Sequence, residues 1–534
     1  MSISNIAVNI LSHLDSPTSL APVVVKDGSN ITGRTLMAEE NGGEHEARER
    51  FIEEFGTGAL WLGGIPLSRL IYDSVVFKKN GLDPEVSIEK LPEIDKQTGK
   101  LKEVVKPQQL SPETLKELSP GAKEEGVKLV EKYLKLNKSK FLISTFVPFA
   151  LLTLVLPKLN QQLSKQIILS RALKEKEKLN RQKQQQPVQR NQVLGPLAFT
   201  EGSINAGLKS DKLKQLEARF RRDISAPTKI EQINGLKQNP GFSGIGTAIL
   251  NVAASAQRDP VNNMILLDLG ISGNRVTFVP RNNQERVEYG VKEGGIIFFL
   301  FFAQGLIQKG FNKLAKAINR PIDLDFKTLF RNEKFTTKMK ELHSLESKQE
   351  QNESIAKLTK VTNGASEPPK EKGFFEKVSD TLSLWFGKPK PVDTTYEKES
   401  YDFIRSNHGK DDYLTLHTAK KTGLLQLDKK NASKLDERKY IDTTKIKNLG
   451  DNIGEFAEAM LRSKEAKGTT AERFIKSVRN TKAAFLAANL AICAGMLGYV
   501  LPKIQYLYRE KVYGNKEFPG TRAYEKEAKK ILEA

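Results

Sequence analysis

Histidines and acidic residues are the first candidates for chemistry. Among the five histidines, only His408 and His417 lie near one another, in the segment HGKDDYLTLH. Asp411 and Asp412 fall between them, and imidazole and carboxylate groups can share a divalent cation. The spacing matches no established ligand pattern, and both acids fall in a polar segment typical of a loop. We therefore expect no metal site here.

Two glycine-containing segments invite comparison with phosphate-binding loops and nucleophile turns. Residues 241–246 read GFSGIG, without a preceding strand or the spacing of a dinucleotide-binding loop. Residues 270–273 read GISG, which is not the GxSxG frame of a nucleophile turn. The sequence has no Walker lysine after a glycine loop, no HExxH and no CxxC, and its carboxylates are scattered among lysines. We expect no enzyme activity and no cofactor, and no catalytic residue can be named.

The composition limits how much of the chain can lie inside a membrane. The 534 residues carry 85 Lys and Arg against 64 Asp and Glu, a net charge of +21, and the mean hydropathy is −0.44. This hydropathy excludes a compact protein made mostly of spans, and the charge suits an anionic partner. The basic run 171–190 has no interleaved aromatic residue, so it favours lipid headgroups or a stalk-like charged helix over nucleic acid. The single cysteine, Cys493, excludes an intramolecular disulfide.

Two uncharged apolar runs are long enough to cross a membrane, Ala483–Pro502 and Phe141–Pro157. Twenty helical residues span about 30 Å, the thickness of the hydrocarbon core. A lysine flanks each run on both sides, and we expect these four to reach the lipid headgroups: Lys140, Lys158, Lys482 and Lys503. The N-terminal segment lacks a basic leader, so we expect no cleavable signal peptide.

Three further runs are weaker candidates for spans: residues 294–308, 55–71 and 238–257. Runs of ten to fourteen apolar residues occur more often in core helices or re-entrant segments. We predict a mainly α-helical, multi-pass membrane protein with two to four spans and basic helical regions outside the bilayer. Positive charge crowds both flanks of the two longest runs, so it does not set their orientation.

Composition also suggests the remaining organisation. In the segment 264–280, apolar residues on both sides of a turn at Gly270, Gly273 and Asn274 predict a minor β-hairpin, while the polar segment 344–372 predicts a disordered linker. The predicted order of segments is 1–50, polar; 51–186, first membrane half ending in a charged helix; 187–284, soluble; 285–343, second membrane half and a basic helix; 344–372, linker; 373–388, amphipathic helix; 389–468, soluble and basic; 469–512, long helix with the span; and 513–534, charged tail.

The amphipathic segment 374–386 places bulky side chains on one helical face. Such a face could lie in a membrane interface or dock in a groove of a protein partner. Its predicted interface residues are Phe374, Phe375, Trp385 and Phe386.

Small residues predict where helices approach closely. A stripe with four-residue spacing lies in the longest span, and glycines in the first weak run offer a matching surface: Ala483, Ala487, Ala491, Gly495, Gly58 and Gly63. We expect these faces to drive helix association, including homo-oligomers.

The two best spans end alike, in Val155-Leu156-Pro157-Lys158 and Val500-Leu501-Pro502-Lys503. In each half, a glycine-led apolar segment precedes the span, with Gly58 and Gly295 as the matched glycines. This order suggests an internal repeat of a helix pair.

The sequence favours a non-enzymatic structural or adaptor protein that holds partners or anionic lipid at a plasma or inner membrane. The spans contain no charged residue, and charged residues within spans usually mark ion or proton pathways. Two alternatives stay open: a transporter or channel built from a duplicated helix pair, and a soluble or peripheral basic helical interaction protein.

Overall fold

A computed structural model describes residues 3–15, 19–95, 98–102, 107–185, 243–258, 260–364 and 394–533. The chain divides into two units, Met1–Ala172 with Ala248–Ala534, and Leu173–Thr247. The smaller unit contains the end of α6 (Leu156–Gln185) and the start of α8 (Ser243–Arg258). The described residues are mainly helical and include no β-strand, which confirms the mainly α-helical part of the predicted class.

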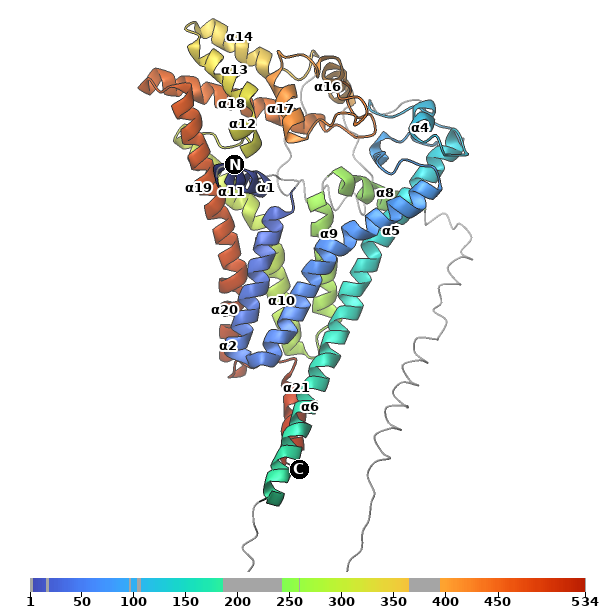
Figure 1. The fold of residues 1–534 in the computed structure, drawn as a ribbon, viewed down its shortest axis with the longest axis vertical. Helices are drawn as coiled ribbons and strands as arrows, with labels where there is room; N and C mark the ends of the chain where they lie inside the picture. Colours follow the sequence, from blue (N-terminus) through green and yellow to red (C-terminus); the bar gives the residue numbers. More distant parts are fainter. Residues whose placement is uncertain are drawn as a thin grey trace, which may run out of the picture. The chain divides into compact units, whose positions relative to one another are not determined.

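Long helices form the bundle that holds the candidate site (Figure 1). Among the described residues, three continuous helices are long and apolar enough to cross a membrane: Val127–Gln182, Asn283–Ala317 and Ala471–Tyr513. The first consists of α5 (Val127–Ala150), η4 (Leu151–Val155) and α6. The second consists of α10 (Asn283–Ile297), η7 (Phe298–Phe302) and α11 (Ala303–Ala317). The third consists of α19 (Ala471–Gly495), η8 (Met496–Val500) and α20 (Leu501–Tyr513). The other long helices are α2 (Ala21–Ala59), continued by η1 (Leu60–Gly64) and α3 (Ile65–Tyr72), and α9 (Pro260–Thr277).

The helix α2 folds back on itself at Gly43. This residue has φ 80° and ψ 179°, a conformation that only glycine adopts readily. The two arms run antiparallel, because Asn30 in the first arm lies 3.5 Å from Glu54 in the second. A Cβ placed on Gly58 would lie 2.9 Å from the Asp27 carboxylate, so the arms also touch nearer their far ends.

The first and third long helices share a proline just after a π-helical turn. Each has a π-helical turn directly before its Leu-Pro-Lys sequence, η4 before Pro157 and η8 before Pro502. Proline has no amide hydrogen and leaves the carbonyl four residues earlier without its helical partner. In the first helix that carbonyl belongs to Thr153 and accepts a hydrogen bond from the Asn274 side chain at 2.8 Å.

Smaller helices pack in two groups outside the bundle. One surrounds the start of α5, where Phe77, Leu115 and Tyr133 form a buried core, and contains η2 (Asp73–Phe77), η3 (Ile88–Lys90) and α4 (Pro112–Leu118). The other packs on the first turns of α19 and contains α12 (Phe326–Arg331), α13 (Glu333–Ser344), α14 (Lys348–Thr359), α16 (Thr394–Asn407), α17 (Leu414–Thr422) and α18 (Thr443–Lys467). The helices α1 (Ile3–Asp15) and α21 (Arg522–Glu533) lie near the chain ends.

Two predictions of local structure are wrong. The segment 264–280 forms the helix α9 and no hairpin. Its buried residues Met264, Leu267 and Ile271 have helical spacing. Gly270, which suggested a turn, instead lets Phe149 approach, since a Cβ there would lie 2.9 Å from that ring.

The predicted linker 344–372 also contains a helix. Its described part includes α14, which packs against α18 and buries Leu358. The tertiary contact stabilises a helix whose composition alone indicated disorder. The amphipathic segment 374–386 lies outside the described residues, with Phe374, Phe375, Trp385 and Phe386.

Candidate functional site

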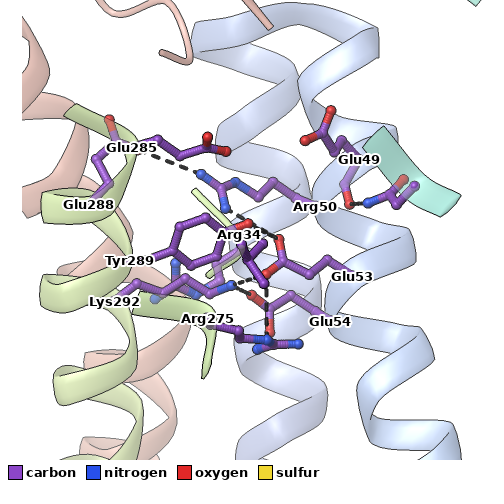
Figure 2. Close-up of polar contacts among 12 residues, drawn as sticks. Arg34, Glu49, Arg50, Glu53, Glu54, Arg275, Glu285, Glu288, Tyr289 and Lys292 are labelled. Atoms are coloured by element: carbon purple, nitrogen blue, oxygen red, sulfur yellow. Dashed lines mark hydrogen bonds and ion pairs between the residues drawn. The ribbon is translucent and has the colours of Figure 1, made fainter. Parts of the chain in front are cut away.

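A cluster of buried charged residues lies between α2, α9, α10 and α20 (Figure 2). Seven glutamates meet six basic side chains there, and we call these residues the charged cluster: Arg34, Glu46, Glu49, Arg50, Glu53, Glu54, Arg275, Arg281, Glu285, Glu288, Lys292, Glu293 and Arg509. All are buried except Arg281, whose side chain is 13% exposed.

Two helices present this charge toward the interior and apolar side chains toward the outside. In the second arm of α2, Glu46, Glu49 and Glu53 are buried, whereas Phe51 and Phe55 are 44% and 52% exposed. The same inversion occurs in α10, where the buried glutamates and Lys292 lie opposite the exposed Val287 and Val291. A surface helix in water has the reverse pattern, with its apolar stripe inside.

Lys292 lies at the centre of the cluster. Its ammonium group is 2.6 Å from a Glu54 oxygen, 2.9 Å from Glu53 and 3.4 Å from Glu293. Arg275 on α9 pairs with Glu293 at 3.1 Å. One ammonium group thus separates three carboxylates that would otherwise repel one another.

Two arginines each bridge one glutamate from α2 and one from α10. Arg509 lies 2.9 Å from Glu46 and donates to Glu288 at 2.8 Å. Arg281 lies 2.6 Å from Glu49 and 2.7 Å from Glu285. The charged cluster therefore fastens the second arm of α2 to α10.

Phe518 closes one end of the charged cluster. Its ring is 2% exposed, and the guanidinium carbons of Arg50, Arg281 and Arg509 lie 4.2, 5.2 and 5.2 Å from the ring centroid. Arginine above an aromatic face is attracted by the negative charge of the ring face. The loop between α20 and α21 thus covers the three arginines with one side chain.

Several helix contacts around the cluster occur twice, in matching positions of the two halves. A Cβ on Gly56 would meet the Leu156 side chain at 2.9 Å, and a Cβ on Gly295 would meet Leu501 at 2.5 Å. Both leucines directly precede the proline of a Leu-Pro-Lys sequence. Gly56 and Gly295 therefore each pack closely against the leucine of a Leu-Pro-Lys sequence.

Amide side chains one turn further along make a second matched pair. Asn160 donates to the Glu49 carbonyl at 2.8 Å, and Gln505 donates to the Glu288 carbonyl at 3.1 Å. Each amide stands four residues after the matched leucine. A third pair involves the carbonyls released by proline: that of Thr153 faces Asn274, and that of Gly498 faces Gly33.

The sequence around these contacts has the same spacing in both halves. In the first arm of α2, Asp27 stands seven residues before Arg34, and in α9 Asp268 stands seven residues before Arg275. The acids that follow also match in spacing, with a glycine two residues after the last: Glu46, Glu49, Glu54 and Gly56 in one half, Glu285, Glu288, Glu293 and Gly295 in the other. At one matched position the charges are opposite, Glu53 and Lys292, and these two residues pair with each other.

Apolar side chains surround the bundle at the level of the cluster. The exposed large apolar residues at this level come from four helices: Phe51, Phe55, Leu159, Leu163, Val287, Val291, Ile504 and Leu507. Large contiguous apolar patches are rare on monomeric proteins in water.

The direction of α9 constrains the path of the chain. Gly270 faces Phe149, and further along Gln161 donates to the Val279 carbonyl at 3.0 Å, so α9 runs parallel to α5 and α6. The start of α9 therefore lies at the end of the bundle where α5 begins. The intervening residues 186–242 contain charged residues and no apolar run as long as a span.

The four flanking lysines differ in their surroundings. Lys158 and Lys503 are exposed, as expected for headgroup contacts, and Lys140 pairs with Asp73 at 2.6 Å. Lys482 is 5% exposed, lies 2.9 Å from Asp15 and donates to the Ile322 carbonyl at 2.8 Å. It therefore joins three parts of the fold instead of reaching outward.

The predicted small-residue stripe faces away from the bundle. Ala487, Ala491 and Gly495 are exposed, whereas Ala483 is half-buried beside Leu486 and Leu490. A Cβ on Gly63 or Gly495 would meet nothing within 4 Å. The contact that requires small residues is instead Gly33 on Gly498, and association of the exposed stripe with another chain stays a prediction.

The charged cluster is not predictable from residue types and spacing alone. Its glutamates stand among arginines and lysines and resemble an exposed charged helix. The available signal was the apolar face opposite the charges, with Phe51 and Phe55 alternating with acids. Among the described residues no group of three or more His, Cys, Asp or Glu could hold a metal ion.

Comparison with protein-family models, curated proteins and solved structures gave no match for this chain.

Proposed function

We propose that this chain is an integral membrane protein that moves protons, or a solute coupled to protons, through a duplicated helical bundle. The observation that carries the proposal is the charged cluster at the interface of the two halves, inside helices whose outer faces are apolar. The sequence favoured an adaptor because its apolar runs contain no charged residue. We prefer a transport function because α2 and the start of α10 supply buried charges between the helices.

The energetic argument favours a working role over a purely structural one. Burying an ion pair removes two charges from water, and well-packed apolar residues of similar volume are often equally stabilising. Charged residues at membrane depth commonly mark ion or proton pathways. A bundle that needed only rigidity could use leucine at positions such as Glu53 and Lys292.

Two carboxylates are the candidates for carrying a proton. Asp27 and Asp268 occupy matched positions in the two halves. Within the described part of the chain neither forms an ion pair with a basic group, and Asp268 Oδ2 accepts no hydrogen bond. A carboxylate without a fixed cation can bind and release a proton more readily than one held by arginine.

The duplication supports this class of function. We infer that each half contributes three helical segments: the first arm of α2, its second arm and α5–α6 in one half, and α9, α10–α11 and α19–α20 in the other. The matched contacts of Gly56, Gly295, Asn160 and Gln505 support this assignment. Many transporters place their binding site at the interface of such repeats.

A second candidate is a peripheral helical protein whose apolar faces are covered by a partner. The polar connection 186–242 favours it, because a chain that crosses a membrane in parallel helices must cross back between them. Carbonate extraction separates the two candidates, since alkaline carbonate releases a peripheral protein and leaves an integral one in the membrane.

Proton movement is tested in vesicles that contain the purified full-length protein and a pH-sensitive dye. A potassium gradient with valinomycin supplies the driving potential. We expect the parent protein to acidify or alkalinise the lumen faster than empty vesicles, and Asp27→Asn/Asp268→Asn to abolish the difference. Lys309→Met, which removes an exposed charge on α11, is the matched control and keeps the flux. Equal rates in the parent and the double variant would contradict the proposal.

A further inference from the structure

A cavity of about 710 Å³ opens beside α3, away from the charged cluster. One wall follows a single helical face of α3 and η2, and the other comes from the loop after η2. The lining residues are Pro66, Arg69, Leu70, Asp73, Ser74, Lys78, Leu82 and Pro84. A volume of several hundred Å³ is typical of small-ligand sites.

Arg69 gives the cavity its chemical character. Its side chain is half-buried and, within the described residues, forms no hydrogen bond and no ion pair. The carboxylate of Asp73, one turn away, is held by Lys140 at 2.6 Å. A half-buried guanidinium without a fixed partner offers several donors to an anion, and phosphate fits its planar geometry.

Lys78 and Ser74 extend this polar surface toward the end of the helix. Lys78 is exposed, and the Ser74 hydroxyl, which donates to the Ile71 carbonyl at 3.0 Å, keeps its oxygen free to accept. The apolar surface begins on the other side of Arg69, where Leu67 and Leu70 are 58% and 65% exposed. The cavity therefore has a cationic end and an apolar end.

The polar end lies at the level where the apolar part of the bundle begins. The Lys140–Asp73 ion pair joins the residue that precedes the run 141–157 to the wall of the cavity. At this boundary a phospholipid presents its phosphate to basic side chains and its acyl chains to apolar ones.

We propose that this cavity binds one anionic phospholipid, with its phosphate on Arg69 and Lys78 and its acyl chains along Leu67 and Leu70. The proposal rests on the membrane location proposed above but not on proton movement. A soluble phosphate ester shares the headgroup chemistry, but the exposed leucines favour a molecule with acyl chains.

The test counts phosphatidylglycerol bound to the detergent-purified full-length protein by native mass spectrometry. We expect one tightly held phosphatidylglycerol on the parent. Retention on Arg69→Gln/Lys78→Gln should be about 30-fold weaker, since the loss of each basic group near the headgroup weakens binding about five-fold. Arg69→Lys keeps the charge and should retain most of the binding. Lys128→Gln/Lys135→Gln removes two exposed charges on α5 outside the cavity and should bind as the parent does.

Three results would overturn the assignment. Equal retention by the parent and Arg69→Gln/Lys78→Gln would remove these residues from any lipid site. Retention of phosphatidylcholine equal to that of phosphatidylglycerol would show that binding does not depend on the net charge of the headgroup. Binding of glycerol 3-phosphate as tight as that of phosphatidylglycerol would assign the cavity to a soluble phosphate. Release of the protein by carbonate would instead refute the membrane location, so the two failures are distinguishable.

Discussion

Replacement of Lys292 by methionine tests whether the charged cluster is a balanced network. The variant keeps the length and apolar stem of the side chain but removes the ammonium group that lies 2.6 Å from Glu54 and 2.9 Å from Glu53. Both carboxylates then lose their nearest cation in a site where they are 4% and 3% exposed. Removing one partner of a buried ion pair costs about 3–5 kcal/mol of stability.

Thermal unfolding in detergent measures this loss. A destabilisation of this size should lower the unfolding midpoint by roughly 6–10 °C, taking about 2 °C per kcal/mol for a chain of this size. Lys309→Met makes the same chemical change at an exposed site of α11 and should shift stability by less than about 0.5 kcal/mol.

A second variant separates lost charge balance from lost packing. Glu54 has Lys292 as its nearest basic group, so Glu54→Gln in the Lys292→Met background removes the unpaired charge. We expect the double variant to regain part of the midpoint, with a coupling energy of about 1–3 kcal/mol. If Lys292→Met behaves like Lys309→Met, or if Glu54→Gln lowers the midpoint further, the balanced-network reasoning is refuted.

Three other predictions concern packing, the aromatic cover and pH. Gly33→Ala should lower stability by about 1–3 kcal/mol, because its Cβ would collide with the Gly498 carbonyl. Gly28→Ala in the same helix is the control, since its Cβ would meet nothing within 4 Å and stability should not change. Equal thermal unfolding midpoints for the two variants would contradict this prediction. Phe518→Leu keeps apolar volume but removes the ring face seen by three arginines, so it should cost about 1–2 kcal/mol, and an unchanged midpoint would contradict the cover. Outside the bundle, a hydrogen bond from Lys429 lowers the pKa of the Glu85 carboxyl to about 2. This contact therefore stabilises the fold above the usual glutamate pKa and is lost as the pH falls toward 2. The midpoint difference between the parent and Glu85→Gln should be small, since the side chain of Lys429 is 73% exposed and that of Glu85 is 33% exposed, and it should shrink as the pH falls through 2. A difference that grows on acidification would reverse the assigned sign.

The sequence predicted helices correctly where a long apolar run indicated them. The runs 141–157 and 483–502 both lie within longer continuous helices, as their length and apolar composition predict, although Pro148 lies inside the first run. Glycines misled the prediction at 264–280, because a glycine that admits a neighbouring side chain looks in sequence like one that makes a turn.

The sequence by itself determined that this chain is helical, strongly basic and apolar enough in three helices to enter a membrane. Those properties depend on residue type and short-range spacing, which act within one helix. Only the tertiary structure decided that the charges of α2 and α10 face each other, because which residues pair depends on the fold at Gly43 and on contacts between residues more than two hundred positions apart. The same packing decided that Ala487 and Ala491 face outward while Gly33 and Gly498 meet, since a stripe of small residues fixes how close a partner can come but not which helix it is.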